Sequence, residues 1–384
     1  MRSPASMDTI QIDCTNACLL RCNGCTRFCG HHTKPFFMSM DDFKQAVDSL
    51  EGFARERNGI VGLMGGEPTL APLFPEYVSY MKSKIPRANL GLWSIFPETK
   101  KHYREIICEA FGNILLNDHS RDDIVHAPIL MGSEEFFRKA CPNCNGRGKV
   151  DLDADDSGTN CGICHGTGGV TDDAALFQAV DKCWVQESWS ASIHPKGAYF
   201  CEVAAALAET FNGPDGWKVE PGWWKRTPKD FAEQMDWACR RCGAAMPIER
   251  NRTTKDATDD VSPLNLERLK EIKSRKLARG EVQVHEDFRF DQKLTENHGY
   301  PFQSYKDQIY RQTIAARYGI TLVMNQRGYW DPRLSESIPK PEPSLFHILS
   351  ERYPVDAGKA VDASGMVSPQ QEGARQPRSA VQSI

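Results

Sequence analysis

Strand-like and helix-like patterns of hydrophobic residues alternate along the first third of the chain. Residues 8–13 alternate as in a short strand, and residues 40–54, after the N-cap candidate Ser39, carry apolar side chains at helical spacing. Further strand-like runs are residues 59–64, 89–96, 113–118 and 127–131, and further helix-like runs are residues 75–85 and 100–111. This alternation indicates parallel β/α units, whose functional residues are expected at the carboxyl ends of the strands.

The pattern changes near residue 140. Residues 141–148 and 161–168 are two copies of CxxCxGxG, and a polar, Asp-rich stretch separates them. Residues 190–202 predict a hairpin that turns at Pro195-Lys196-Gly197. Residues 262–280 predict a basic helix, and the residues from about 355 have the composition of a disordered tail.

Composition excludes some classes of protein and emphasises the cysteines. The net charge of −4 gives no general attraction to nucleic acid or to an anionic membrane. No apolar stretch approaches the roughly 20 residues of a membrane-spanning helix, and residues 1–10 resemble neither a signal nor a transit peptide. We therefore expect a cytoplasmic protein without membrane contact. In the reducing cytoplasm, clustered cysteines favour metal binding over disulfides. Of the 14 cysteines, 11 have the spacings of metal ligands or are plausible partners of such cysteines.

The first cysteine group has the spacing Cys-x3-Cys-x2-Cys, at Cys18, Cys22 and Cys25. Three thiolates on one tight loop can hold three irons of a [4Fe–4S] cluster and leave the fourth iron open. This group resembles the cluster motif of the radical S-adenosylmethionine (SAM) superfamily. The resemblance implies that SAM binds the open iron and is cleaved by one electron to a 5′-deoxyadenosyl radical. It also implies a flavodoxin- or ferredoxin-type reductant. A zinc knuckle or an ordinary cluster is the alternative.

A second segment extends the resemblance. Gly65, Gly66, Glu67 and Pro68 follow the second predicted strand and resemble the superfamily's GGEP segment, in which glycines admit SAM and Glu67 would receive its ammonium group. Ser94 and Asn117, at the ends of the next two strands, are further candidate SAM contacts. One departure is Gly24, which stands where the superfamily often has an aromatic residue.

The two CxxCxGxG copies resemble half of the zinc-binding region of the DnaJ chaperone family. Cys141, Cys144, Cys161 and Cys164 would form a closed, tetrahedral, four-thiolate Zn²⁺ site. We expect a structural staple, with a substrate-binding finger or an additional iron–sulfur cluster as alternatives.

The last group resembles the SPASM/twitch extension of radical SAM enzymes. Gly197 and Cys201 match its Gly-x3-Cys step, and the resemblance implies one auxiliary [4Fe–4S] cluster on Cys183, Cys201, Cys239 and Cys242. A second zinc site is the alternative. Cys14 and Cys29 flank the first loop without fitting its spacing, and we interpret them as buried thiols.

Together, these features predict an α/β fold: a partial (β/α)6 TIM-like barrel with an inserted zinc-knuckle module and a C-terminal auxiliary-cluster domain. The expected divisions are a barrel core at 8–140, a zinc module at 141–169, an auxiliary iron–sulfur domain at 170–250, a helical or mixed extension at 251–354 and a tail at 355–384.

The expected function is hydrogen-atom abstraction from a peptide or from a carbohydrate- or nucleotide-type small molecule. The alternatives are radical modification of a nucleic-acid base and a non-catalytic zinc or iron–sulfur scaffold. The substrate, the reaction outcome and the fate of SAM are not predicted from these residues.

Overall fold

One mixed sheet organises the protein. The structure is a computed structural model that describes residues 2–116, 125–150, 158–181, 183, 185–186, 190–246, 251–252, 257–286, 323–324 and 330–331. In the sheet the strands follow the order β11-β10-β1-β2-β3-β4-β16-β15. Their bounds are β1 Thr9–Asp13, β2 Ile60–Met64, β3 Leu90–Ser94, β4 Asn113–Leu116, β10 Ser190–His194, β11 Gly197–Tyr199, β15 Val323–Met324 and β16 Trp330–Asp331.

The strands from β10 to β4 pair in parallel, whereas β11 and β16 are antiparallel to their neighbours. This arrangement confirms the α/β class and the parallel sheet. The predicted hairpin is also confirmed, because β10 and β11 pair from Ser192↔Tyr199 to His194↔Gly197. Since β10 pairs with β1, this hairpin from the predicted 170–250 domain belongs to the main sheet.

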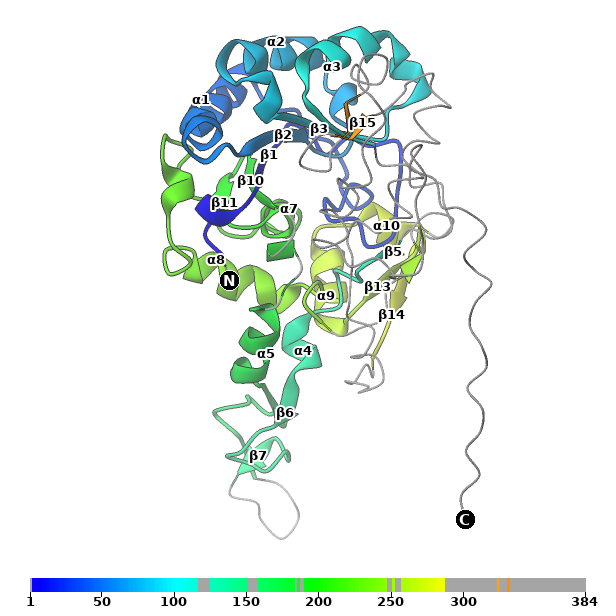
Figure 1. Cartoon of the computed structure of the whole chain (residues 1–384). Coiled ribbons are helices and arrows are strands. Elements are labelled where there is room, and N and C mark those ends of the chain that lie inside the picture. Colours follow the sequence, from blue (N-terminus) through cyan, green and yellow to red (C-terminus); the bar gives the residue numbers. More distant parts are fainter. Residues whose placement is uncertain are drawn as a thin grey trace, which may run out of the picture.

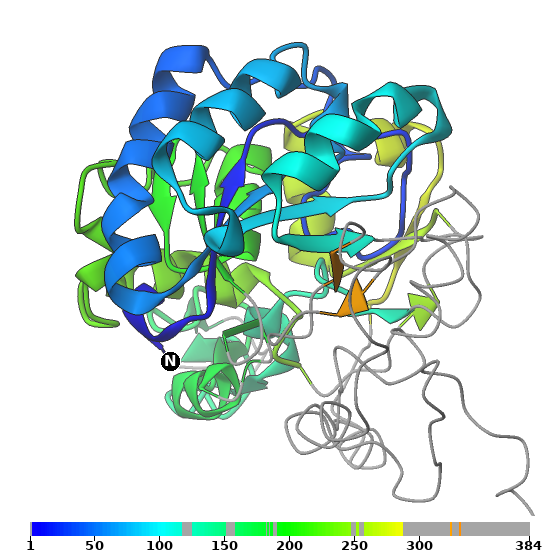
Figure 2. The ribbon, with the colours of Figure 1, turned by 45° about the horizontal axis from the view of Figure 1, so that its top comes forward.

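Helices pack along the sheet and extend below it (Figure 1). Helices α1, α2 and α3 form a row over one side of the sheet in both Figure 1 and Figure 2, and α7 packs on β10. The helix bounds are α1 Met40–Arg57, α2 Phe74–Lys84, α3 Arg104–Ala110, α4 Ser133–Phe136, α5 Asp173–Val180, α7 Glu202–Thr210, α8 Ala232–Arg241, α9 Pro263–Glu271 and α10 Arg275–Ala278. The 3-10 helices are η1 Pro4–Ser6, η2 Pro68–Leu70, η3 Arg87–Asn89, η4 Glu98–Tyr103 and η5 Trp223–Lys225.

Helix α1 shows why the sequence pattern predicts the elements near the site. The Ser39 hydroxyl accepts a hydrogen bond from Asp42 N–H, and Asn58 ends the helix in a left-handed conformation. Its apolar face, which includes Phe43, Leu50 and Phe53, is fully buried against the sheet core. A helix with both ends capped and one apolar face stabilises the strand edges from which the site loops leave.

In the part of the chain that the structure describes, four short strand pairs lie outside the main sheet. They are β5 Val125–His126 with β12 Asn251–Arg252, β6 Arg138–Ala140 with β9 Gly169–Thr171, β7 Lys149–Val150 with β8 Thr159–Asn160, and β13 Asp259–Val261 with β14 Val282–Val284. The pairs β6–β9 and β7–β8 carry the CxxCxGxG copies on an arm that projects from the lower end of the molecule (Figure 1).

Two sequence predictions were wrong. Residues 127–131 form turns instead of a strand, because Pro128 has no N–H and the carbonyls of Ile129 and Leu130 accept bonds from Gly243 and Ser262. The predicted basic helix at 262–280 is two helices, α9 and α10, because Lys273 between them takes a positive φ of 54°.

The predicted divisions of the chain stay predictions, and the tail at 355–384 lies outside the described residues. Within the described residues, no helix is both long and apolar enough to cross a membrane.

Candidate functional site: a cysteine loop on the parallel sheet

The cysteine loop after β1 and the GGEP segment after β2 are hydrogen-bonded to each other. The N–H of Gly66 donates to Thr15 O, and the N–H of Glu67 donates to Ala17 O, both at 2.7 Å. A Cβ on Gly65 would lie 2.1 Å from Thr15 O. The glycines are therefore required for the two loops to pack, at the carboxyl ends of adjacent parallel strands.

The loop gathers four cysteines. Cys18, Cys22 and Cys25 are partly exposed, and burial together with the neighbouring Cys25 and Cys18 thiols raises the pKa of Cys22. Hydrogen bonds with Cys18 and Cys25, together with burial, raise the pKa of the Cys29 thiol. Cys29, which we interpreted as a buried thiol outside the triplet spacing, therefore lies beside the triplet, and its role as a ligand is a question for experiment.

A turn in the backbone brings Cys29 back to the loop. Phe28 takes a positive φ of 52° and its N–H donates to Cys25 O at 3.1 Å. Its ring is buried and stands edge-on to that of His31. A bulky residue adopts this conformation only where its surroundings hold it, so burial of Phe28 maintains the turn.

These thiols suit an iron–sulfur cluster in chemistry and spacing. Soft thiolates on a partly exposed loop are the usual ligands of such clusters. Among the described residues, only the Cys141 group places three or more candidate ligand atoms within 4.8 Å of one another. At the Cys18 loop the candidate ligand atoms are not gathered within that distance.

Glu67 is occupied by the protein itself. Its Oε1 accepts from the N–H and hydroxyl of Thr69 at 3.1 and 2.6 Å and from the Ser94 hydroxyl at 2.8 Å, and its Oε2 accepts from Ile95 N–H at 2.8 Å. Burial raises the pKa of this carboxyl in spite of those four bonds. Glu67 and Ser94 therefore tie the end of β2 to the end of β3. Contact of either residue with SAM stays a prediction, and Asn117 lies outside the described residues.

A buried charged group that sequence reasoning missed lies beside the loop. Arg27 reaches Asp13 at 3.0 Å and Glu202 at 3.1 Å, and its Nη2 also donates to Gln11. Ser192 donates to Asp13 at 2.8 Å, so the group joins β1, β10 and α7. No local spacing relates Arg27 to Glu202, which lies 175 positions later, so this group could not be predicted from the sequence.

A small cavity of about 10 Å³ adjoins this group. Its lining includes Asn16, His32, His194 and Glu209. Burial lowers the pKa of His32 to about 4 and that of His194 to about 3, so both imidazoles are neutral near pH 7. The cavity therefore presents neutral imidazole nitrogens close to a buried arginine.

The predicted auxiliary cysteines line a different, apolar pocket. Cys183, Cys201, Cys239 and Cys242 share it with Phe200, Leu207 and several alanines and valines. Burial raises the pKa of Cys201 and Cys239, and it raises that of Cys242 to about 12. Without a metal these thiols stay protonated near neutral pH, and a bound metal would deprotonate them. The structure thus brings all four predicted ligands together, and their metal stays a prediction.

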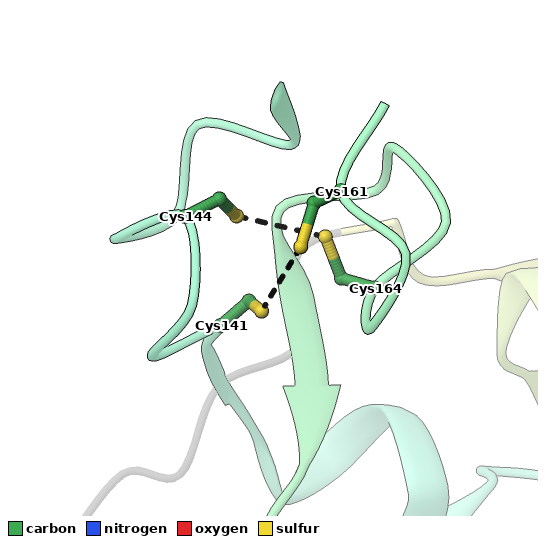
Figure 3. Close-up of side chains that lie close together, drawn as sticks. All are labelled: Cys141, Cys144, Cys161 and Cys164. Atoms are coloured by element: carbon green, nitrogen blue, oxygen red, sulfur yellow. Dashed lines mark hydrogen bonds between the residues drawn. The ribbon is translucent and has the colours of Figure 1, made fainter. Parts of the chain in front are cut away.

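The compact Cys141 group has the geometry of a single-ion site (Figure 3). The sulfurs of Cys141 and Cys161 lie 3.8 Å apart, those of Cys144 and Cys164 lie 3.6 Å apart, and all four lie within 4.8 Å of one another. Gly148 N–H donates to the Cys144 sulfur at 3.2 Å. A hydrogen bond from Asn143 lowers the pKa of Cys161 to about 6. Four buried thiols this close together, one CxxC pair between β6 and β7 and the other between β8 and β9, suit one tetrahedral metal ion.

Comparison with known proteins gives only a faint structural likeness. No known protein family matches the chain, and no curated protein matches it. Among solved structures the chain is similar to BtrN in complex with AdoMet and 2-DOIA, with a TM-score of 0.24 and 16% sequence identity. The match covers 29% of this chain and 45% of that chain, so the chain spans less than half the length of this neighbour. At that TM-score the assignment of function has to rest on the site itself.

Proposed function

We propose that this protein is a radical SAM enzyme. The observation that carries the proposal is the placement of the Cys18 loop at the end of β1, hydrogen-bonded to the Gly65–Pro68 segment at the end of β2. If the cysteine loop were a zinc knuckle and the Gly65–Pro68 segment an unrelated turn, the two would have no reason to be in contact. In the structure they are held together at the ends of adjacent strands. The strand order from β10 to β4 supports the finer proposal of a partial (β/α)6 barrel.

The residues of the loop have separable roles in this proposal. Cys18, Cys22 and Cys25 would hold a [4Fe–4S] cluster, and the Gly65–Pro68 segment would line the SAM site. When bound, the cluster supplies one electron for reductive cleavage of SAM to the 5′-deoxyadenosyl radical that abstracts a hydrogen atom. Glu67 and Ser94 fix the β2 and β3 ends so that the loop keeps its position. A flavodoxin- or ferredoxin-type protein is the proposed reductant.

The surroundings of the loop favour a polar substrate. Arg27 and the neutral His32 and His194 offer buried hydrogen-bonding groups beside the loop. These groups suit a peptide or a carbohydrate- or nucleotide-type small molecule. The nucleic-acid alternative is less favoured, because Trp223 and Trp224 are buried and present no face for stacking a base.

The other cysteine groups complete the proposal. We assign Zn²⁺ to the compact Cys141, Cys144, Cys161 and Cys164 site as a structural staple of the projecting arm. The apolar setting of Cys183, Cys201, Cys239 and Cys242 supports a SPASM/twitch-like auxiliary [4Fe–4S] cluster, since a cluster deprotonates thiols that are otherwise inert.

Cys29 favours one rival function. A fourth thiol in contact with Cys18 and Cys25 would, as a permanent ligand, close the open iron or complete a four-thiolate zinc site. The protein would then be a non-catalytic zinc or iron–sulfur scaffold. The two functions differ in one respect that an experiment can reach, which is whether a ligand other than cysteine can bind the cluster.

The test is anaerobic reconstitution with iron and sulfide, reduction, addition of SAM and detection of 5′-deoxyadenosine by mass spectrometry. Cys22→Ala removes a proposed ligand, and Cys108→Ala, outside every cysteine group, is the matched control. We expect product from the wild type and from Cys108→Ala and none from Cys22→Ala. A wild-type protein that carries its clusters and leaves SAM intact would favour the scaffold.

A further inference from the structure

Two buried charged residues from the later part of the chain, Asp259 and Lys276, hydrogen-bond the backbone of the cysteine loop. Asp259 begins β13, and its Oδ1 accepts a hydrogen bond from the N–H of Gly24 at 2.6 Å. Its Oδ2 accepts from Lys276 Nζ at 2.6 Å and bonds His31 Nε2 at 2.8 Å. Gly24 stands between Cys22 and Cys25, so the carboxylate holds the backbone between two proposed ligands.

Lys276 makes a second contact with the same stretch of loop. Its Nζ donates to Cys22 O at 3.2 Å, and the side chain is 1% exposed. It passes over Gly30, where a Cβ would lie 2.7 Å from Lys276 Cδ. The loop lies beside α10 in Figure 1 and next to the same yellow segment in Figure 2.

Further bonds fasten the same segment to the far end of the loop. His31 Nδ1 bonds the Ser274 hydroxyl at 2.8 Å, and Arg275 N–H donates to His31 O at 3.2 Å. Arg21 pairs with Glu281 at the edge. The loop is therefore held from both sides, by the GGEP segment on one side and by residues 259–281 on the other.

Such a group is unlike an ordinary surface network. Burying a lysine and an aspartate is unfavourable unless they are paired and hydrogen-bonded, and replacing them by apolar residues is often no less stable. Although burial raises the pKa of Asp259, the hydrogen bond from His31 and the Lys276 charge hold it below its usual value. A charged carboxylate suits the Gly24 N–H, and a charged lysine beside Cys22 suits negative thiolates.

We propose that Asp259 and Lys276 are positioning residues for the cluster on Cys18, Cys22 and Cys25. Asp259 fixes the conformation of Gly24 between two ligands, and the Lys276 charge compensates the negative charge of the thiolate-bound cluster. The segment 259–281, which follows every other element of the site in the chain, completes the cluster site. This inference rests on one part of the proposed function, namely that an iron–sulfur cluster binds this loop.

The test follows the cluster itself in the full chain. Reconstituted wild type, Lys276→Met, Lys276→Arg and Asp259→Asn are compared for thermal unfolding, for the rate at which a chelator removes iron, and for the midpoint potential of the cluster by EPR-monitored titration. Lys270→Met, an exposed lysine of α9 paired with Glu267, is the matched control. The auxiliary cysteines are changed to alanine in every sample, so that one cluster gives the signal.

We expect Lys276→Met and Asp259→Asn to lose iron about 10- to 100-fold faster than the wild type, because removal of a group that orients metal ligands typically weakens metal affinity by that factor. Lys276→Met should also lower the midpoint potential, because the reduced cluster carries one more negative charge and has lost its nearby cation. Lys276→Arg should restore both properties in large part, and Lys270→Met should match the wild type.

Folded Lys276→Met and Asp259→Asn proteins with wild-type iron loss and potential would overturn the proposal. If a single variant does not fold because it leaves one charge unpaired, the double variant Asp259→Asn/Lys276→Met removes both charges and carries the test. Its expected result is faster iron loss than Lys270→Met, and an equal rate would contradict the proposal. None of these readouts needs SAM cleavage, so failure of the proposed function would be seen separately, as a stable cluster that leaves SAM intact.

Discussion

Glu67 should stabilise the protein even when no SAM is present. In Glu67→Gln the side-chain oxygen can take the position of Oε1, which accepts three hydrogen bonds in the wild type. The new amide NH₂ then takes the position of Oε2, which in the wild type accepts from Ile95 N–H at 2.8 Å. Two donors then face each other in a fully buried site. Loss of a hydrogen bond to a charged group, with one donor left unsatisfied, corresponds to about 2 kcal/mol of unfolding free energy.

The expected decrease in melting temperature is about 4–8 °C at most, since about 1 kcal/mol corresponds to roughly 2–4 °C in a domain of about 150–250 residues and to less in a larger one. The assay is thermal unfolding of the metal-free protein at pH 7, followed by circular dichroism. Glu76→Gln, at an exposed glutamate in the first turn of α2, should change stability by less than about 1 kcal/mol.

A Glu67→Gln protein that melts within about 1 °C of the wild type would refute the reasoning. It would mean that the carboxyl, whose pKa burial raises, is already protonated in the folded protein and that its oxygen near Ile95 contributes no charge. Ser94→Ala, which removes one of the four donors, should lie between wild type and Glu67→Gln.

Three more predictions concern the other titratable and metal-binding groups. Cys161→Ser should lower the zinc content of the purified protein by about one ion per chain without changing its iron content, because the Cys141 group is separate from the loop; equal zinc in both proteins would argue against the site. Burial lowers the pKa of His32 from 6.5 in the unfolded chain to about 4 in the folded protein. As the pH falls from 6.5 to about 4, the unfolded chain therefore binds the proton before the folded protein does, and the free energy of unfolding decreases by about 3 kcal/mol over this range. Urea titrations at several pH values should show this loss in the wild type and a smaller loss in His32→Gln, and equal slopes would contradict it. Cys29→Ala should keep both the cluster and SAM cleavage if Cys29 only neighbours the triplet, whereas loss of iron equal to that of Cys25→Ala would identify it as a ligand.

The features predicted correctly from the sequence are those with a local cause. Alternating and helical patterns predict β1, α1 and β2, because each segment buries one face against the sheet whatever its distant neighbours are. The CxxCxGxG copies predict a compact thiol group, because each pair of cysteines is set by a tight turn of a few residues. The β10–β11 hairpin is predicted by its turn residues in the same way.

Features that depend on distant contacts were missed or predicted wrongly. Asp259 and Gly24 are 235 positions apart, and no spacing reveals that a carboxylate from one caps the other. Residues 127–131 have a strand-like composition, yet their carbonyls bond to residues more than 100 positions later. The role of Glu67 could be predicted only in part, since the motif indicates a buried acid but not the donors that surround it.

The central claim is that the cluster on Cys18, Cys22 and Cys25 has one iron open to SAM. The most direct measurement is EPR of the reduced, reconstituted protein before and after addition of SAM, with the auxiliary cysteines replaced by alanine. We expect SAM to change the spectrum of the cluster in the wild type and in Cys29→Ala. A cluster that is fully formed and reduced, and whose spectrum SAM leaves unchanged in both proteins, would contradict it.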